Sequence, residues 1–572
     1  MTPAPPADTA AVRVQPNPPG SIAAAARAFG DDYPPIERQW RIRAVGTILV
    51  LTTLLYVPWM LGSLNSGLAW LAWPFAAANL FSLGYSVLSV ANAWSRHAPP
   101  RRPLPAGAEP TVAVIIPTCC ESVPMILRTV TSVLEQDWPA DKLLVVVSDD
   151  GHDPRLEEAL AHTPARYFSP VPRFSPGRDG AAKAGNLNSA VAMLDAEYPD
   201  VAYIETRDAD DELGSNGFLR QVVGQLEADE RLAFVQTIKE AQVSPGDPFN
   251  NRESMFYRGQ MLARNSANAV FPCGSGVVWR RRALRSIGDF PTWNLVEDLQ
   301  SGVEALRRGW RGLYLPIVGA VGQHSPEDVP NVYKQRGTWA IDTVRLMVWG
   351  NLKGLGLRQR AHFLEMLLFY LNAFTALVYV PSIALSLLGW GPLDSSGFGY
   401  ITRMVPLILA TEAWLLVVSY PYNDRRRNQR RYVRSLWQVR IMWAGMAPVY
   451  MMATVQALLG GRHRKPAYKV TRKYDDIRWH WRHTLPQTAL VLSLACVLLY
   501  VLRRGSLPSL SLLAVALYWG GLNVVLLTGF LARGWHGMTG IRRVVARSLA
   551  SRPGPRPRSA VPEEDVVVEQ AA

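Results

Sequence analysis

Two pairs of carboxylates follow apolar stretches of the sequence and have the residue types that hold a hard cation. Asp208 and Asp210 lie in "RDADDE", just after "VAYIET", and Asp149 and Asp150 come just after "LLVVVS". Carboxylates two residues apart on a tight turn can jointly bind Mg²⁺, whose shell is completed by waters and phosphate oxygens. The simpler interpretations are a solvated acidic loop for the first pair and an Asp-Gly turn for the second.

A third acidic pair, Glu297 and Asp298, opens a stretch with helical periodicity. Apolar residues recur at helical spacing in this stretch, at Leu299, Val303 and Leu306. Asn294, three residues before Glu297, completes the pattern of a capping box, which predicts a structural role for Glu297. Asp298 has no such role, so we interpret it as a general base that accepts a proton from a hydroxyl group.

Two further segments have the composition of a ligand site. "AAKAGNLNSA" (181–190) contains Lys183, whose ammonium group can pair with phosphate, and Gly185, which lets a ligand approach the backbone. The alternative is an ordinary helix start. "FPCGSGVVWRR" (271–281), with Cys273, supplies small residues against which a flexible sugar chain can pass.

The elements that must position these residues are those of an α/β domain. Short β-rich runs occur at 111–117, 142–151, 201–211 and 232–237, and helical patterns lie between several of them, at Met125–Leu134 and Leu187–Leu194. This alternation predicts βαβ units and a mainly parallel sheet. Ligands bind at the carboxyl ends of strands in such sheets, where both the Asp149 and the Asp208 pairs are expected.

The apolar content of the 572 residues, whose net charge is +14, is unevenly distributed. Long runs with few charges lie at about 44–62, 68–94, 363–389, 404–420, 485–502 and 511–532. Each is near or above the roughly 18–20 residues that cross a bilayer core, which favours membrane helices over buried core helices.

Charge distribution predicts the topology of these helices. The basic stretches 423–440 and 460–482 are both expected on the cytoplasmic side. The apolar segment between them, 441–459, would place them on opposite sides if it crossed the membrane, so we interpret it as an interfacial or re-entrant helix. Two spanning helices then precede the α/β domain and four follow it, with both termini in the cytoplasm.

The ordered set of motifs "SDDG", "KAGN", "DAD", "CGSG", "VED" and "QRGTW" resembles the membrane-embedded family 2 glycosyltransferases. The subgroup that it resembles most is the bacterial cellulose synthase catalytic subunit and related processive polysaccharide synthases. Each motif is weakly specific alone, whereas their order and spacing over about residues 108–480 are specific. The resemblance implies a GT-A-like nucleotide-sugar transferase domain inserted in an α-helical transmembrane bundle.

The resemblance also implies roles for the acidic residues and Lys183. Asp149 and Asp150 would contact the uridine of a UDP-sugar, and Lys183 would lie near the nucleotide. Asp208 and Asp210 would bind Mg²⁺ or Mn²⁺ on the diphosphate. Asp298, in a TED motif that reads "VED" here, would deprotonate the acceptor hydroxyl. The acceptor-binding residues implied in this way are Glu297, Cys273, Gln335, Arg336 and Trp339.

The acceptor motif of the family, QxxRW, departs from its pattern in this chain. Gln335 and Trp339 keep their places, but Thr338 stands where the family has an arginine that is thought to bind the diphosphate. Arg336 and Arg345 are the two candidates to replace that charge. Downstream, "AYKVTRK" (467–473) resembles the gating loop of cellulose synthases, with Tyr468, Val470, Thr471 and Lys473 as its matching residues.

We therefore predict five regions along the chain. They are a disordered segment 1–40, two transmembrane helices in 41–97, a cytosolic glycosyltransferase domain 108–345, four transmembrane helices in 346–535 with an interface helix at about 435–459 and a gating-loop-like segment 466–473, and a disordered tail 536–572.

The expected function is inverting, processive transfer from a UDP-sugar, first UDP-glucose, into a β-linked glucan that the chain exports through its own channel. The alternatives are a chitin- or hyaluronan-type synthase, a non-processive transferase with a lipid acceptor, and a catalytically dead channel or scaffold. The expected partners are the growing polysaccharide, the lipid bilayer and an accessory export or regulatory subunit, with no nucleic acid. The expected location is the plasma (inner) membrane.

Overall fold

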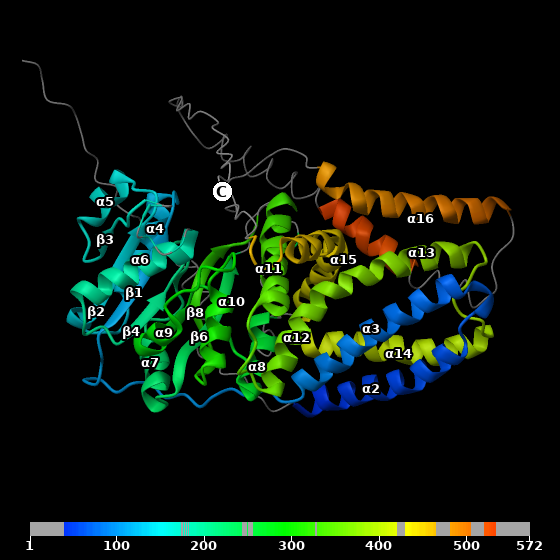
Figure 1. Cartoon of the computed structure of the whole chain (residues 1–572), viewed down its shortest axis with the longest axis horizontal. Coiled ribbons are helices and arrows are strands. Elements are labelled where there is room, and N and C mark those ends of the chain that lie inside the picture. The colour runs from blue at the N-terminus through cyan, green and yellow to red at the C-terminus, as the bar shows by residue number, and fades with distance from the viewer. Residues whose placement is uncertain are drawn as a thin grey trace, which may run out of the picture.

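The computed structural model places a sheet-containing domain beside a bundle of long helices (Figure 1). It describes residues 39–172, 182–242, 256–326, 329–419, 429–464, 481–504 and 520–533, together with 175, 176, 178, 180 and 249. The segments predicted to be disordered and the gating-loop-like segment 466–473 lie outside the described residues, apart from the short overlap at 39–40.

The domain is built on one eight-stranded sheet with the order β3-β2-β1-β4-β7-β6-β8-β5. The strands are β1 (Val112–Thr118), β2 (Leu143–Asp149), β3 (Arg166–Phe168), β4 (Tyr203–Thr206), β5 (Glu212–Leu213), β6 (Leu232–Gln242), β7 (Val277–Arg280) and β8 (Arg311–His324). Strands β3, β2, β1 and β4 are parallel, β7 is antiparallel to both its neighbours, and β6 pairs parallel with β8. The carboxyl ends of β2 and β4 therefore lie at the same edge of the sheet.

Alternation along the strands assigns helices to the two faces of the sheet. On β1, Val114 and Ile116 pack with α4 (Val123–Leu134) and α5 (Pro154–Leu160). Ala113 and Ile115 face the other way and pack in the cluster that includes α6, α9 and α10. The remaining helices of the domain are α6 (Ala182–Glu197), α7 (Phe218–Ala228), α8 (Met261–Ala267), α9 (Arg281–Ile287) and α10 (Asp298–Arg307).

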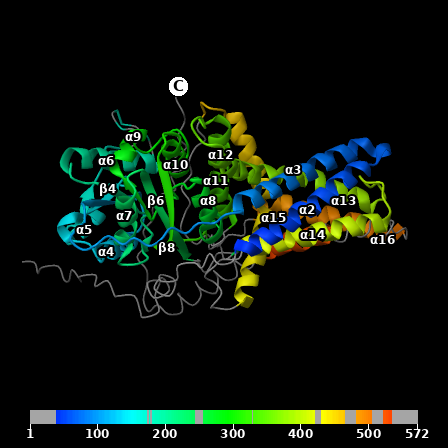
Figure 2. The ribbon, with the colours of Figure 1, turned by 90° about the horizontal axis from the view of Figure 1, so that it is seen from below.

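The helical bundle contains the long apolar helices. They are α2 (Gln39–Gly62), α3 (Ala69–Ala93), α12 (Leu357–Leu371), α13 (Ala376–Leu387), α14 (Gly397–Ser419) and α16 (Leu485–Arg504), which run side by side in Figures 1 and 2. Six described segments are long and apolar enough to cross a membrane: Gln39–Gly62, Ser66–Ala93, Leu357–Leu387, Phe398–Val418, Trp437–Gly460 and Trp481–Arg504. Large apolar side chains such as Leu54 and Leu55 point outward from this bundle, as lipid-facing residues do.

Two helices lie between the sheet and the bundle: α11 (Val329–Trp349) and α15 (Gln429–Gly460). Val332 and Val344 of α11 pack with Ile441 and Met446 of α15 in one apolar cluster. In Figures 1 and 2, α15 runs across the direction shared by α2 and α14. Residues Trp437–Gly460 of α15 are long and apolar enough to cross a membrane. The interfacial position of this helix therefore stays a prediction, which its transverse direction favours.

The predicted fold class is confirmed, and the four β-rich runs became β1, β2, β4 and β6. Four strands were not predicted: the short strands β3 and β5, and the longer β7 and β8. The segment that forms β8 contains a proline and several glycines, which weaken a strand pattern. Strand β7 lies in the segment 271–281, which was singled out only for its small residues. The predicted span 511–532 is described only from residue 520, where Gly521–Arg533 is a shorter apolar helix.

Candidate active site

Asp208 lies between two lysine side chains beyond the end of β4. Nζ of Lys183 is 2.6 Å from its Oδ1, and Nζ of Lys239 is 2.9 Å from its Oδ2. Lys183 comes from the first turn of α6 and is also 3.3 Å from Oε1 of Glu297. Lys239 comes from β6 and is also 3.3 Å from Oδ2 of Asp211. The two ammonium groups thus join four elements of the domain around one carboxylate.

These contacts set the charge state of the site. Burial opposes the charges, but attraction to Asp208 outweighs it and raises the pKa values of both Lys183 and Lys239. In return, the two ammonium groups overcome the burial of Asp208 and hold its pKa below the ordinary range. Burial raises the pKa of Asp211 in spite of Lys239. The site therefore presents charged lysines and a charged Asp208 at neutral pH.

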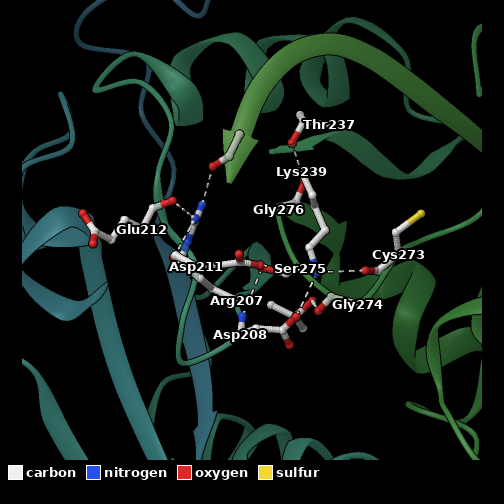
Figure 3. A network of polar contacts seen from close by, with 12 residues as sticks. Arg207, Asp208, Asp211, Glu212, Thr237, Lys239, Cys273, Gly274, Ser275 and Gly276 are labelled. Carbon is white, nitrogen blue, oxygen red and sulfur yellow. Dashed lines mark hydrogen bonds and ion pairs between the residues drawn. The ribbon is translucent and has the colours of Figure 1, made fainter. Parts of the chain in front are cut away.

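The turn that carries Asp208 is organised by a fully buried arginine. Nη1 of Arg207 donates to the carbonyl oxygens of Asp211 and Glu212, at 3.2 and 3.1 Å, and Nη2 donates to that of Gly319 at 3.0 Å. Nε of Arg207 donates to Oε1 of Glu205 at 2.7 Å. Figure 3 shows this fan of contacts beside Asp208 and Lys239. The rigid fork of an arginine suits this task because several fixed donors reach several carbonyl groups at once.

The segment 273–276, predicted to contact the acceptor, lies against the two lysines through its backbone. Gly274 and Gly276 have φ angles of 81° and 62°, which lets the backbone turn tightly there. The carbonyl oxygen of Cys273 lies 3.4 Å from Nζ of Lys239, whereas its thiol points away from that lysine in Figure 3. Burial and the neighbouring Asp298 raise the pKa of the Cys273 thiol. The segment therefore presents backbone and a neutral thiol rather than a thiolate.

Asp298 begins α10 and faces the same glycine as Lys183. A Cβ atom added to Gly274 would lie 3.2 Å from Nζ of Lys183 and 3.5 Å from Oδ2 of Asp298. Burial, followed by repulsion from Glu297, raises the pKa of Asp298 to about 7. A carboxylate with this pKa is suited to proton transfer near neutral pH.

The predicted capping box at the start of α10 is wrong. Glu297 is itself the residue that precedes the helix, and its side chain accepts no capping hydrogen bond from the first turn. Its carboxylate turns instead to Lys183. The backbone N–H of Asn294 donates to Oε1 of Gln300 at 3.1 Å, and its side chain donates to the carbonyl oxygen of Asp342 at 3.0 Å. Attraction to the lysine outweighed the local capping pattern.

Asp149 and Asp150 end β2 at the same edge of the sheet, and both carboxylates are engaged by the protein. Asp149 accepts hydrogen bonds from Thr118, Tyr167 and the backbone N–H groups of residues 151 and 153, at 2.8 to 3.1 Å. Asp150 forms an ion pair of 2.8 Å with Arg178, and both side chains are almost fully buried. Both residues thus order the loop after β2, and a contact with uridine stays a prediction.

Gly185 has a different role from the one expected. A Cβ atom at this position would lie 1.9 Å from the carbonyl oxygen of Gly180. The close approach that requires glycine is therefore made by the protein's own backbone. It fixes Arg178 and Gly180 against the first turn of α6, which carries Lys183.

The acceptor-motif residues lie on α11. Arg336 is buried with its guanidinium 4.9 Å from the centre of the Trp339 ring, and Gln335 and Trp339 are half-buried. Oγ1 of Thr338 donates to the carbonyl oxygen of Lys334 at 2.8 Å. The structure brings these residues to the helix between the sheet and the bundle.

Arg345, the second candidate for the missing charge, contacts Trp293 and Asn294, and its role as the replacement stays a prediction. Its guanidinium stacks 4.7 Å from the centre of the Trp293 ring and lies 3.3 Å from Oδ1 of Asn294. Arg336 stacks on Trp339 instead of pairing with Asp208. The cations that the structure places against Asp208 are Lys183 and Lys239.

Three positioning residues were missed in the sequence. Lys239 lies in β6, two residues beyond the predicted β-rich run 232–237, where a single lysine carries no signal of a site. Arg178 lies just outside the segment 181–190, five residues before Lys183. Asp342 accepts the backbone N–H groups of Leu295 and Val296, at 2.8 and 2.9 Å, from across the domain. Only tertiary contacts identify these three residues.

The carboxylates fit a divalent cation in the company of ligand oxygens. No group of three His, Cys, Asp or Glu side chains could hold a metal ion within the described ranges. Nucleotide-bound Mg²⁺ needs only one or two carboxylates, because phosphate oxygens and waters complete its shell. Asp208 keeps 22% of its side chain exposed, and Asp210 lies two residues further along the turn.

Comparisons with known proteins identify the families that the chain resembles. Residues 110–341 match the family described as "Glycosyltransferase like family 2". The chain is 30% identical over 450 residues to cellulose synthase 2 of Novacetimonas hansenii, covering 74% of this chain and 26% of that protein. It is 28% identical over 477 residues to a UDP-forming cellulose synthase catalytic subunit of Pseudomonas fluorescens, covering 79% and 60%.

Among solved structures, a mannosyltransferase from Pyrobaculum calidifontis in complex with GDP-Man and Mn²⁺ aligns with a TM-score of 0.45 and 20% identity, covering 67% of this chain and 99% of that one. The chain spans about a quarter of the length of several of the curated relatives it matches. Residues 110–341 thus match the family 2 glycosyltransferases, and the chain is similar to bacterial cellulose synthase catalytic subunits.

Proposed function

We propose that the chain is an inverting, processive membrane glycosyltransferase that polymerises a UDP-sugar into a β-linked polysaccharide. UDP-glucose is the proposed donor and a β-glucan the proposed product. The observation that carries this proposal is the placement of Asp298 and Lys183 beside the same side of Gly274, with Lys183 bound to Asp208. A base and a phosphate-binding charge are thus held close to each other, beside one glycine.

In the proposed reaction, Asp298 takes the proton of the acceptor hydroxyl as its oxygen attacks the anomeric carbon of the donor. The bond from that carbon to the diphosphate breaks, and its electron pair stays on UDP. One displacement with one base inverts the anomeric centre, so an α-linked donor gives a β-linkage. The pKa of Asp298, about 7, leaves a large fraction of it ionised in neutral solution.

The diphosphate side requires positive charge, because UDP leaves poorly unless its growing negative charge is neutralised. Lys183 and Lys239 are the cations of this region. A divalent cation, Mg²⁺ or Mn²⁺, bound by Asp208 and Asp210, would supply further charge to the leaving group. Asp149 and Asp150 are the proposed neighbours of the uridine.

The acceptor side is proposed to run from Cys273 and Glu297 toward α11. Aromatic faces hold sugar rings by apolar stacking without fixing their register, and Trp339 is the proposed stacking residue. Gln335 and Arg336 lie on the same helix. The position of α11 between the sheet and the apolar bundle supports passage of the product toward the membrane helices.

We also propose a location, a gating loop and a partner subunit for this chain. The catalytic domain is proposed to face the cytosol at the plasma (inner) membrane, because the basic stretches that flank the apolar segment 441–459 favour that side. Residues 466–473 are proposed as a gating loop. An accessory export or regulatory subunit is a proposed partner, consistent with the similarity to cellulose synthase subunits.

The test is to incubate membranes containing the full chain with radiolabelled UDP-glucose, UDP-N-acetylglucosamine and UDP-glucuronate in parallel, and to digest the product with linkage-specific glycanases. A labelled polymer released only by a β-glucanase is the expected result. A label that moves into solvent-extractable lipid would replace polymerisation by lipid glycosylation. A chitinase-sensitive or hyaluronidase-sensitive polymer would change the proposed sugar and keep the mechanism.

A further inference from the structure

The lysine pair around Asp208 has a consequence for metal binding. Both oxygens of this carboxylate are already bound to ammonium groups, Lys183 on Oδ1 and Lys239 on Oδ2. We infer that Lys183 competes with the divalent cation for Asp208, so that the cation binds tightly only together with a nucleotide diphosphate. This inference rests on the proposed function for the identity of the nucleotide, but the competition itself concerns only Lys183 and Asp208.

Of the two lysines, Lys183 is the one that can be displaced. Its side chain is 29% exposed, against 3% for Lys239. Lys239 is enclosed by Asp208, Asp211 and the carbonyl oxygen of Cys273. Moving Lys239 would leave the buried carboxylate of Asp211 without its cation, which is costly. Moving Lys183 toward solvent exposes a group that is already partly solvated.

Electrostatics explains why the cation needs the diphosphate. A dication that approaches Asp208 alone adds two positive charges beside two ammonium groups, and repulsion in a partly buried site is strong. A nucleotide diphosphate brings negative charge and gives Lys183 a new partner, because an ammonium group pairs readily with phosphate. Oδ1 of Asp208 is then released to the cation, and phosphate oxygens supply its missing ligands.

The neighbours of Lys183 support this exchange. Besides Asp208, it contacts Oε1 of Glu297 at 3.3 Å and the carbonyl oxygen of Gly274 at 3.0 Å. Glu297 and Gly274 can therefore still hold the ammonium group of Lys183 when its contact with Asp208 is broken. Because the described residues contain no three-ligand metal cluster, the carboxylates alone are a weak metal site.

The experiment measures Mn²⁺ binding to the purified full chain in lipid nanodiscs by calorimetry, with and without UDP. In the wild-type chain we expect UDP to tighten Mn²⁺ binding roughly tenfold or more. In Lys183→Met we expect Mn²⁺ alone to bind roughly tenfold more tightly than in the wild type, while UDP binds more weakly in the presence of Mn²⁺. The exposed Lys353→Met variant serves as the matched control and should change neither affinity.

The opposite signs of the two effects in Lys183→Met separate this mechanism from a folding defect, which would weaken both. Equal Mn²⁺ affinity in wild type and Lys183→Met, measured without nucleotide, would overturn the inference. A tighter Mn²⁺ affinity in Lys183→Met with no UDP binding by either chain would keep the competition and overturn the proposed donor.

Discussion

The carboxylate of Asp342 on α11 accepts the backbone N–H of Val296, two residues before Asp298, at 2.9 Å. Its other oxygen accepts the N–H of Leu295 at 2.8 Å. The helix that borders the membrane bundle thus holds the segment that leads into the proposed base. Asp342 is a positioning residue, because its contacts with the site run through the backbone of 295–296.

Replacing Asp342 by asparagine should lower kcat and leave UDP affinity unchanged. The amide keeps one acceptor, so one of the two buried N–H groups loses its partner at a cost of about 1–3 kcal/mol. Asp298 would then lie less accurately against the acceptor hydroxyl. Steady-state kinetics and calorimetry with UDP measure the two quantities. Asp141→Asn, at an exposed site, is the control, and an unchanged kcat for Asp342→Asn would remove the positioning role.

Transfer should depend on pH through Asp298. The base works only when it is ionised, and burial with repulsion from Glu297 raises its pKa to about 7. The rate should therefore fall about tenfold per pH unit below that value and level off above it. Asp208 stays ionised over this range because the lysines hold its pKa low. A profile of kcat/KM that is flat from about pH 5 to about pH 8 would contradict this role for Asp298.

Gly185→Ala should destabilise the domain, because its new methyl group would overlap the carbonyl oxygen of Gly180 at 1.9 Å. Overpacking of this kind costs about 1–3 kcal/mol. Gly217→Ala is the matched control, since no atom lies within 4 Å of a Cβ added there. Thermal unfolding of the two variants measures the difference. Equal midpoints would mean that the Gly180 segment yields without cost.

The sequence predicted those site residues that sit at the ends of elements. Asp208 and Asp149 follow strands, and Lys183 and Asp298 begin helices, so their places follow from local patterns. These patterns also predicted βαβ units and apolar spans. The roles of the same residues were less accessible: Gly185 meets the protein backbone, and Glu297 binds Lys183 instead of capping α10.

The supporting residues could not be found in this way. Lys239 contacts the carbonyl oxygen of Cys273, and Arg207 contacts that of Gly319. Both partners are distant in the sequence. A buried lysine on a strand looks like a mismatch in an apolar run until its carboxylate partners are known. Strand β8 was missed for a related reason: its glycines and proline weaken a strand pattern, whereas its pairing with β6 holds it in the sheet.

The measurement that tests the account most directly is sugar transfer by Asp298→Asn beside the wild-type chain. Both are purified as full chains in lipid vesicles and incubated with radiolabelled UDP-glucose and Mg²⁺, and UDP binding is measured in parallel. We predict that the variant binds UDP as the wild type does but incorporates label at least about 100-fold more slowly, because its amide cannot accept the proton. Equal incorporation by the two chains would show that Asp298 is not the base.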